Sequence, residues 1–102
     1  MIRGTTPTHI FTTGVDLSTV SVLWLTYKQG TKVLTKSLED ITIDSEDTTR
    51  FSVTLSQSDT LRFDAGAYVG IQLRVLLADG TALASDIITL GAGEILKDGV
   101  IE

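Results

Sequence analysis

The fold of this chain is decided by residues 51–75, FSVTLSQSDTLRFDAGAYVGIQLRV, where the spacing of apolar residues changes twice. Apolar and polar residues alternate strictly in 51–55 and again in 69–75. Such alternation predicts two β-strands, each with its apolar side chains on one face. The residues between them do not alternate. We therefore expect one short helical turn near 57–62 that carries the chain from one sheet to the opposite one.

The residues of this interruption predict how the corner is built. Ser58 or Asp59 is expected to cap the helical turn, because a side-chain oxygen at this position accepts a hydrogen bond from a free backbone amide. Leu61 and Phe63 are expected to place apolar side chains beneath the end of the sheets, and Gly66 allows a tight return into the next strand. This interpretation explains every residue of the segment without a ligand.

The same period-two pattern, with turn residues roughly every 8–12 positions, predicts an all-β sandwich of about seven strands in residues 1–90. The predicted strands are Thr8–Thr13, Val20–Gln29, Lys32–Ser37, Ile41–Ile43, Arg50–Leu55, Ala67–Leu77 and Leu83–Leu90. All should be antiparallel, because no connection is long enough for a crossover helix. Asp79-Gly80 predicts a hairpin turn. Leu83 and Ile88 can share a face only if one extra residue intervenes, so we expect a β-bulge near Ser85-Asp86.

Residues 91–102, GAGEILKDGVIE, form a tail of different character. Three glycines make it pliable, yet Ile95, Leu96, Val100 and Ile101 are apolar. Two interpretations remain open for this tail. It lies over an edge of its own sandwich, or it docks on a neighbouring subunit.

Trp24 is the only tryptophan and lies in the second predicted strand, where both faces carry apolar residues. One phase of the strand turns Leu23 and Leu25 inward and leaves Trp24 outside, whereas the other phase buries Trp24 with Val20 and Val22. Core burial and an interface role are both compatible with this pattern, since tryptophan is enriched at interface hot spots. The predicted partner interface therefore consists of Trp24 and the four apolar residues of the tail.

The composition limits the classes of partner. A net charge of −5 and a pI near 4.6, with scattered Lys and Arg, disfavour nucleic acid and anionic membranes as partners. The chain has no cysteine, which removes disulfides and thiolate chemistry, and no apolar run has the length of a signal peptide or a membrane span. We expect a soluble protein made in the cytoplasm.

No motif of catalysis or cofactor binding is present, and we predict no catalytic, cofactor-binding or metal-binding residue. His9 is the only histidine and has no partner at metal-ligand spacing, so it is interpreted as a solvent-facing or hydrogen-bonded strand residue. Five acidic residues lie between positions 39 and 47. Two interpretations of the loop 44–47 remain open: it is an acidic turn in contact with solvent, or it binds a cation. The glycines follow no phosphate-binding pattern.

The corner also carries a resemblance to a protein family. The segment 55–68, LSQSDTLRFDAGAY, followed by IQLRV and a closing Asp-Gly, resembles small immunoglobulin-like structural proteins of tailed bacteriophages and prophages of Firmicutes. The opening MIRGTTPTHIF and the return ASDIITL are similar as well, and the N-terminal domain of phage baseplate upper proteins is a more distant likeness. The positions that carry the resemblance are Leu55, Asp59, Thr60, Leu61, Gly66, Tyr68, Asp79 and Gly80.

The resemblance implies an immunoglobulin-like antiparallel sandwich in residues 1–90 that serves as a non-enzymatic component of the virion. Tail, baseplate, neck and head surface are all compatible with it. The partners would be other phage structural proteins and further copies of the chain, joined through edge strands and the C-terminal tail, first in the host cytoplasm and then in the particle. The alternative is a carbohydrate- or receptor-binding sandwich module. The scarcity of aromatic residues and the absence of Asn disfavour that alternative.

Overall fold

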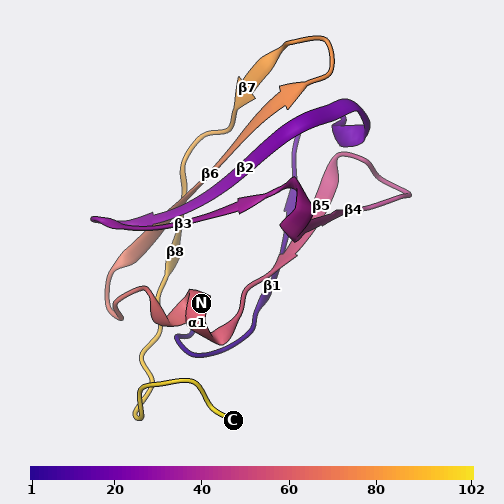
Figure 1. Cartoon of the computed structure of the whole chain (residues 1–102). Coiled ribbons are helices and arrows are strands. Elements are labelled where there is room, and N and C mark those ends of the chain that lie inside the picture. The colour runs from indigo at the N-terminus through magenta and orange to yellow at the C-terminus, as the bar shows by residue number, and fades with distance from the viewer.

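Two antiparallel sheets lie face to face in the computed structural model, which describes all residues from Met1 to Glu102 (Figure 1). One short helix and two 3₁₀ turns, Leu17–Thr19 and Leu38–Asp40, interrupt the strands. The strands and the helix are β1 (Thr8–Thr12), β2 (Val20–Gln29), β3 (Lys32–Ser37), β4 (Ile41–Ile43), β5 (Arg50–Thr54), α1 (Gln57–Leu61), β6 (Tyr68–Leu77), β7 (Ala82–Ala84) and β8 (Ile88–Gly91).

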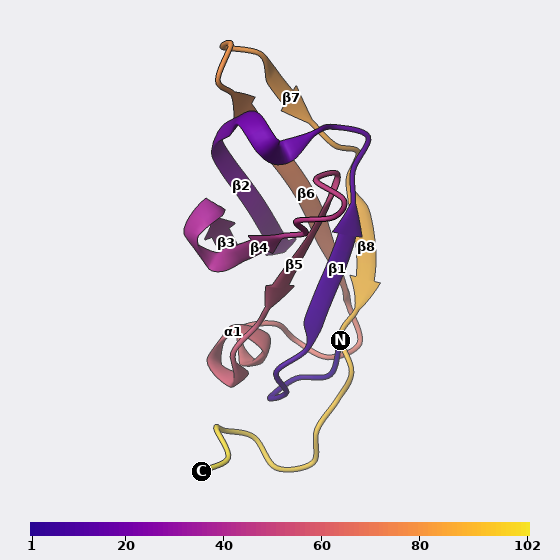
Figure 2. The same cartoon turned by 90° about the vertical axis from the view of Figure 1, so that its right-hand side faces the viewer.

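The sheet topology confirms the predicted all-β antiparallel sandwich. The first sheet has the order β1-β5-β4, and the second has the order β3-β2-β6, with β7 and β8 pairing with successive parts of β6. These are the orders B-E-D and C′-C-F-G of immunoglobulin domains. Every strand pair is antiparallel. Figure 2 shows the two layers edge-on, with β1 and β8 along the same side of the molecule.

Alternation along the strands places one apolar face of each sheet in the core, as the sequence predicted. In β2 the inward side chains are Leu23, Leu25 and Tyr27, and all three are buried. Phe11 and Phe51 face each other across β1 and β5, with ring centroids 5.3 Å apart. The fully buried side chains of the two layers are Leu17, Leu23, Leu25, Tyr27, Phe51, Val53, Leu55, Phe63 and Val69.

The corner between β5 and β6 is a capped helical turn at the predicted place. Asp59 accepts a backbone amide as predicted, but the N-cap residue itself is Ser56 and not Ser58 or Asp59. The cap residue is Ser56, because the residue before the first helical one must be extended, and Ser56 is (φ −81°, ψ 167°). The Asp59 amide donates to Ser56 Oγ (3.1 Å), and the Ser56 amide donates to Asp59 Oδ2 (2.9 Å). Ser56 and Asp59 thus form a capping box, in which Ser56 is the N-cap and Asp59 is the third residue of the helix. Phe63 is fully buried below the sheets, and Leu61 is half-buried.

Asp59 also ties the corner to the second sheet. Its carboxylate forms an ion pair with Lys36 of β3 at 2.9 Å, and both side chains are mostly shielded from solvent. Burial alone would raise the pKa of Asp59, but the Ser56 amide and the Lys36 ammonium together hold it below its usual value. Asp59 therefore stays ionised, and one carboxylate both starts α1 and fastens it to β3.

The predicted last strand, Leu83–Leu90, is wrong as a single strand, because it is divided into β7 and β8. Arg74 faces Ala84 and Ile71 faces Ile88, so three steps along β6 correspond to four along the partner. The predicted extra residue is therefore present near Ser85-Asp86. The Ser85 amide donates to the Leu73 carbonyl (2.8 Å), and the Leu73 amide donates to Ser85 Oγ, where a regular strand would offer a carbonyl (3.0 Å).

His9 generates a pH prediction. Its Nδ1 and the Tyr27 hydroxyl share a hydrogen bond of 2.7 Å that joins the two sheets, and burial lowers the pKa of His9 below its ordinary value. The folded protein therefore binds this proton less tightly than the unfolded chain does. The free energy of unfolding should decrease as the pH falls from about 7.5 through the ordinary histidine value toward about 5. Urea unfolding across this range measures the slope, and His9→Gln should flatten it. Equal slopes in the two proteins would contradict the prediction.

Asp59 generates a stability prediction. Asp59→Ala removes the capping box and leaves the shielded Lys36 without its partner, so the free energy of unfolding should fall by roughly 2–4 kcal/mol. Ser58→Ala, at an exposed position of the same turn, is the matched control and should change it by less than about 0.5 kcal/mol. Urea unfolding at neutral pH compares them. Similar losses in both variants would show that the corner does not depend on Asp59.

Candidate functional site

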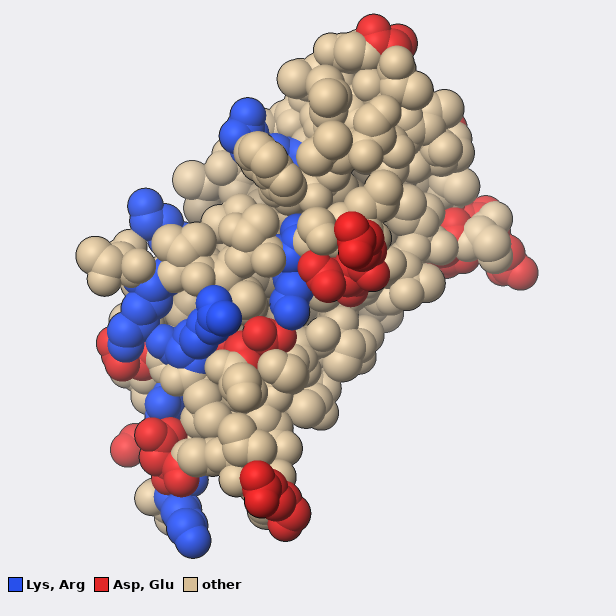
Figure 3. All heavy atoms as spheres, viewed as in Figure 1, with Lys and Arg blue, Asp and Glu red and all other residues tan.

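Exposed apolar side chains gather on three parts of the surface, and these are the candidate interaction sites. They are the outer face of the second sheet around Trp24, the edge formed by β7 and β8, and the C-terminal tail. On the face shown in Figure 3, Lys and Arg gather along one side, whereas a broad area toward the β7 end carries few charges. No group of three or more His, Asp or Glu side chains is arranged to hold a metal ion.

Trp24 lies on the outer face of the second sheet, so the alternative that buried it in the core is wrong. The phase that turns Leu23 and Leu25 inward is the observed one, and 49% of Trp24 is exposed. Arg74 stands opposite Trp24 on β6, with its guanidinium 5.4 Å from the ring centroid in a cation–π contact. Val22 of β2 and its partner Leu76 of β6 extend this apolar face beyond the Trp24–Arg74 pair.

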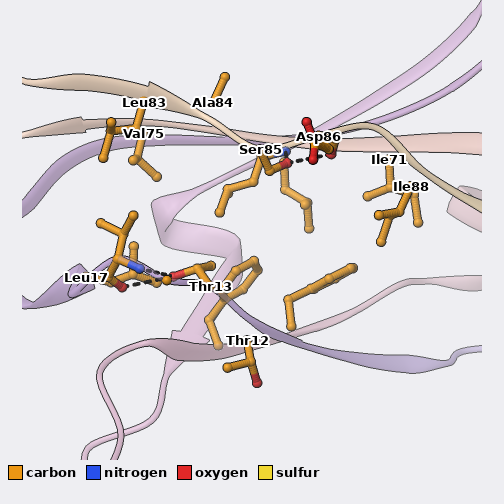
Figure 4. Close-up of a pocket in the computed structure, with 16 residues that line it drawn as sticks. Thr12, Thr13, Leu17, Ile71, Val75, Leu83, Ala84, Ser85, Asp86 and Ile88 are labelled. Carbon is orange, nitrogen blue, oxygen red and sulfur yellow. Dashed lines mark hydrogen bonds between the residues drawn. The ribbon is translucent and has the colours of Figure 1, made fainter.

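A cleft of about 380 Å³ opens between the two sheets, beside the break that separates β7 from β8. It exists because β1 ends at Thr12 and the opposite edge is interrupted after Ala84, so neither sheet extends over the core there. Eleven of its 16 lining residues are hydrophobic, so the cleft suits an apolar group. Figure 4 shows Leu83 and Val75 facing Leu17 across the cleft, with Ser85 and Asp86 at its rim and Ala84 pointing away.

The two strand edges that flank this cleft are free. β1 pairs only with β5, and β7 and β8 pair only with β6. The edge strand β3 carries Lys32 and Lys36, and β4 is only three residues long, whereas β1 has no Lys, Arg, Asp or Glu and so lacks the charges that often protect an edge. The other free edge consists of the two short strands β7 and β8 and the break between them. These two free edges lie on either side of one apolar cleft.

The tail begins by joining its own N-terminus. The Gly93 amide donates to the Met1 carbonyl (2.6 Å) and the Arg3 amide to the Gly93 carbonyl (3.1 Å), which makes a short parallel bridge. Ile95 is half-buried over Gly4. The amide and carbonyl of Ile101 then bind the side chain of Gln57 in α1 (2.6 and 3.0 Å).

Between these two attachments the tail presents apolar side chains to solvent. Leu96 is fully exposed, and Val100 and Ile101 are also exposed. Of the five residues predicted for a partner interface, Ile95 contacts its own chain, and the other four are accessible. The structure does not gather them in one place, because Trp24 lies on the sheet face and the tail lies beyond α1 (Figure 1). Their role in a partner interface stays a prediction.

Arg3 is a structural centre that the sequence analysis missed. Its guanidinium donates to the carbonyls of Phe63 (2.6 Å) and Leu61 (3.2 Å), which the end of α1 leaves free, and it pairs with Asp98 of the tail at 3.1 Å. A basic residue near helix-terminal carbonyls is favourable, but nothing in the sequence places residue 3 beside residue 63.

The acidic loop is held by hydrogen bonds within the protein. Asp44 and Asp47 both approach Arg50 at 3.8 Å. The hydroxyl and the amide of Thr49 lower the pKa of Asp47, since both donate to its carboxylate. The carboxylates of Asp44 and Asp47 therefore bind groups of their own loop and help to hold its turn.

No protein family, curated protein sequence or solved structure matches this chain. Its single α-helix spans five residues, and no helix has the length and apolar character needed to cross a membrane.

Proposed function

We propose that this chain is a non-enzymatic structural component of a tailed phage or prophage particle, in its tail, baseplate, neck or head surface. It assembles with further copies and with other virion proteins through its edge strands and its C-terminal tail. It resides in the host cytoplasm before assembly and in the virion afterwards.

One observation supports this proposal most directly. Two free sheet edges, one of them the uncharged strand β1, flank the same apolar cleft, and a tail with a fully exposed leucine extends from the opposite end of the sandwich. A monomeric protein normally protects such edges against pairing with other chains. Their presence here favours a protein whose edges are covered by neighbours. The acidic net charge keeps free subunits soluble before they assemble.

Oligomerisation tests the proposal. The full chain should form oligomers as its concentration rises from about 10 µM to about 1 mM, since weak contacts between copies populate by mass action. A chain that ends at Gly93 keeps the bridge to Ile2 and should stay monomeric. Sedimentation velocity measures both. Val33→Ser, an exposed apolar position on the lysine-bearing edge strand β3, at the opposite end of its sheet from β7, is the control and should assemble like the unchanged protein.

A full chain that stays monomeric throughout would contradict assembly through these surfaces. Neighbouring genes provide a separate check on the virion role, because portal, capsid or tail genes should flank a gene for a particle subunit.

The second candidate, a carbohydrate- or receptor-binding module, has one observation in its favour. Trp24 is half-exposed on a sheet face, and aromatic rings of this kind stack on sugars and on protein partners. However, the Arg74 guanidinium already lies over the ring, and no Asn is present to bind hydroxyl groups beside it.

Glycan binding separates the two candidates. Under the assembly proposal, an array of glycans should detect no binding by the full chain, and Trp24→Ala should lower the free energy of unfolding by only about 1 kcal/mol, since half of the ring is already in water. Glycan binding that disappears in Trp24→Ala at unchanged stability would favour the binding module instead.

A further inference from the structure

We propose that the cleft beside the β7–β8 break receives Leu96 from the tail of a second copy, and that Lys97 of that copy pairs with Asp86 at the rim. This inference rests on the proposed assembly function. It adds the acceptor site that the tail would bind, and it commits to another copy of this chain as the occupant.

The cleft has the character of an acceptor for an apolar side chain. Core residues of both sheets reach it, among them Leu25, Phe51 and Leu73, so an occupant would extend the core rather than cover a separate patch. Its volume of about 380 Å³ accommodates a leucine side chain with part of its backbone. The free edges of β1 and of β7 and β8 also leave backbone groups beside the cleft available to the backbone of the entering segment.

The tail cannot place Leu96 in the cleft of its own chain. It is attached at both sides of Leu96, by the bridge between Gly93 and Ile2 and by the bonds between Ile101 and Gln57. Both views show the tail beyond the α1 end of the sandwich, whereas the β7–β8 break lies toward the other end (Figures 1 and 2). Leu96 is therefore presented outward and is accessible to a neighbour.

One local charge pair supports the tail as the occupant, because Lys97 is the residue next to Leu96. Asp86 stands at the rim of the cleft and is the only charged residue of the β7–β8 edge. Neither Asp86 nor Lys97 takes part in any of the five ion pairs within the chain. Leu96 and Lys97 lie together at a bend of the tail, and both are exposed. When Leu96 enters the cleft, the flexible stem of Lys97 lets its ammonium reach Asp86 at the rim.

This contact is heterologous, since the donor and acceptor surfaces of each copy are different and lie toward opposite ends of a molecule 47 Å long. Each copy keeps a free cleft at one end and a free tail at the other. Repetition therefore produces a ring if the rotation closes and an open filament if it does not.

Charge reversal at the two positions tests the inference. Asp86→Lys and Lys97→Glu each place like charges across the contact, so each variant alone should assemble about 10-fold or more weakly than the unchanged chain. An equimolar mixture of the two should recover assembly, because every cleft in the mixture then finds a tail of opposite charge. Leu96→Ser should weaken assembly on the order of 10- to 100-fold through the lost apolar burial. Val33→Ser is again the control, and sedimentation velocity is the measurement.

All four positions are exposed in the single chain, so the variants should keep the circular dichroism and the thermal midpoint of the unchanged protein. Recovery in the mixture supports the inference. Normal assembly by the single variants, or failure of the mixture to recover, overturns the cleft as acceptor while leaving the proposed function in place. A full chain that does not assemble at all overturns both.

Discussion

The carboxylate of Asp59 is the contact on which the sandwich depends, because it joins the start of α1 to β3. It accepts a hydrogen bond from the Ser56 amide at the start of α1, the Asp59 amide in turn donates a hydrogen bond to Ser56 Oγ, and the carboxylate forms an ion pair with Lys36 of β3. The chain must change sheets at this point, and a mobile corner would leave β5 and β6 free to shift against each other. Fixing the corner fixes which faces of these strands meet, and with them the position of Phe63 beneath the core.

A second consequence of the fixed corner is the position of the tail. Because α1 ends under the sheets, its free carbonyls meet the Arg3 guanidinium, which in turn holds Asp98. Gln57 in the same helix binds the far end of the tail at Ile101. The segment between these contacts is held in an outward arc, and Leu96 is presented to solvent rather than folded against the chain. A local capping motif thus determines which side chain the molecule offers to its surroundings.

The opposite end of the molecule has the complementary character. The break at Ser85 preserves the pairing with β6 through a side-chain hydroxyl, but it interrupts the edge strand and opens the core between the sheets. Together with the free edges of β1 and of β7 and β8, the opening makes one side of the sandwich suited to pairing with another chain.

How far the sequence could predict these features differs between elements. Alternation in 51–55 and 69–75 predicted the strands, their inward faces and the sandwich, because period two directly encodes which face is buried. The extra residue near Ser85 was also predictable, since Leu83 and Ile88 have incompatible phases. The cap was misplaced by two or three residues, because Ser56, Ser58 and Asp59 all have capping side chains and only the backbone conformation selects among them. For Trp24 the sequence left two phases open, since both faces of β2 are apolar.

The sequence by itself determined the all-β class, the strand positions, the corner and the apolar tail, because each of these follows from the pattern of near neighbours along the chain. Only the tertiary structure decided that Arg3 joins the corner to the tail, that His9 meets Tyr27, and that the cleft lies between two free edges. Those features bring together residues far apart in sequence. Their meeting depends on how the two sheets are stacked, and no local pattern records that.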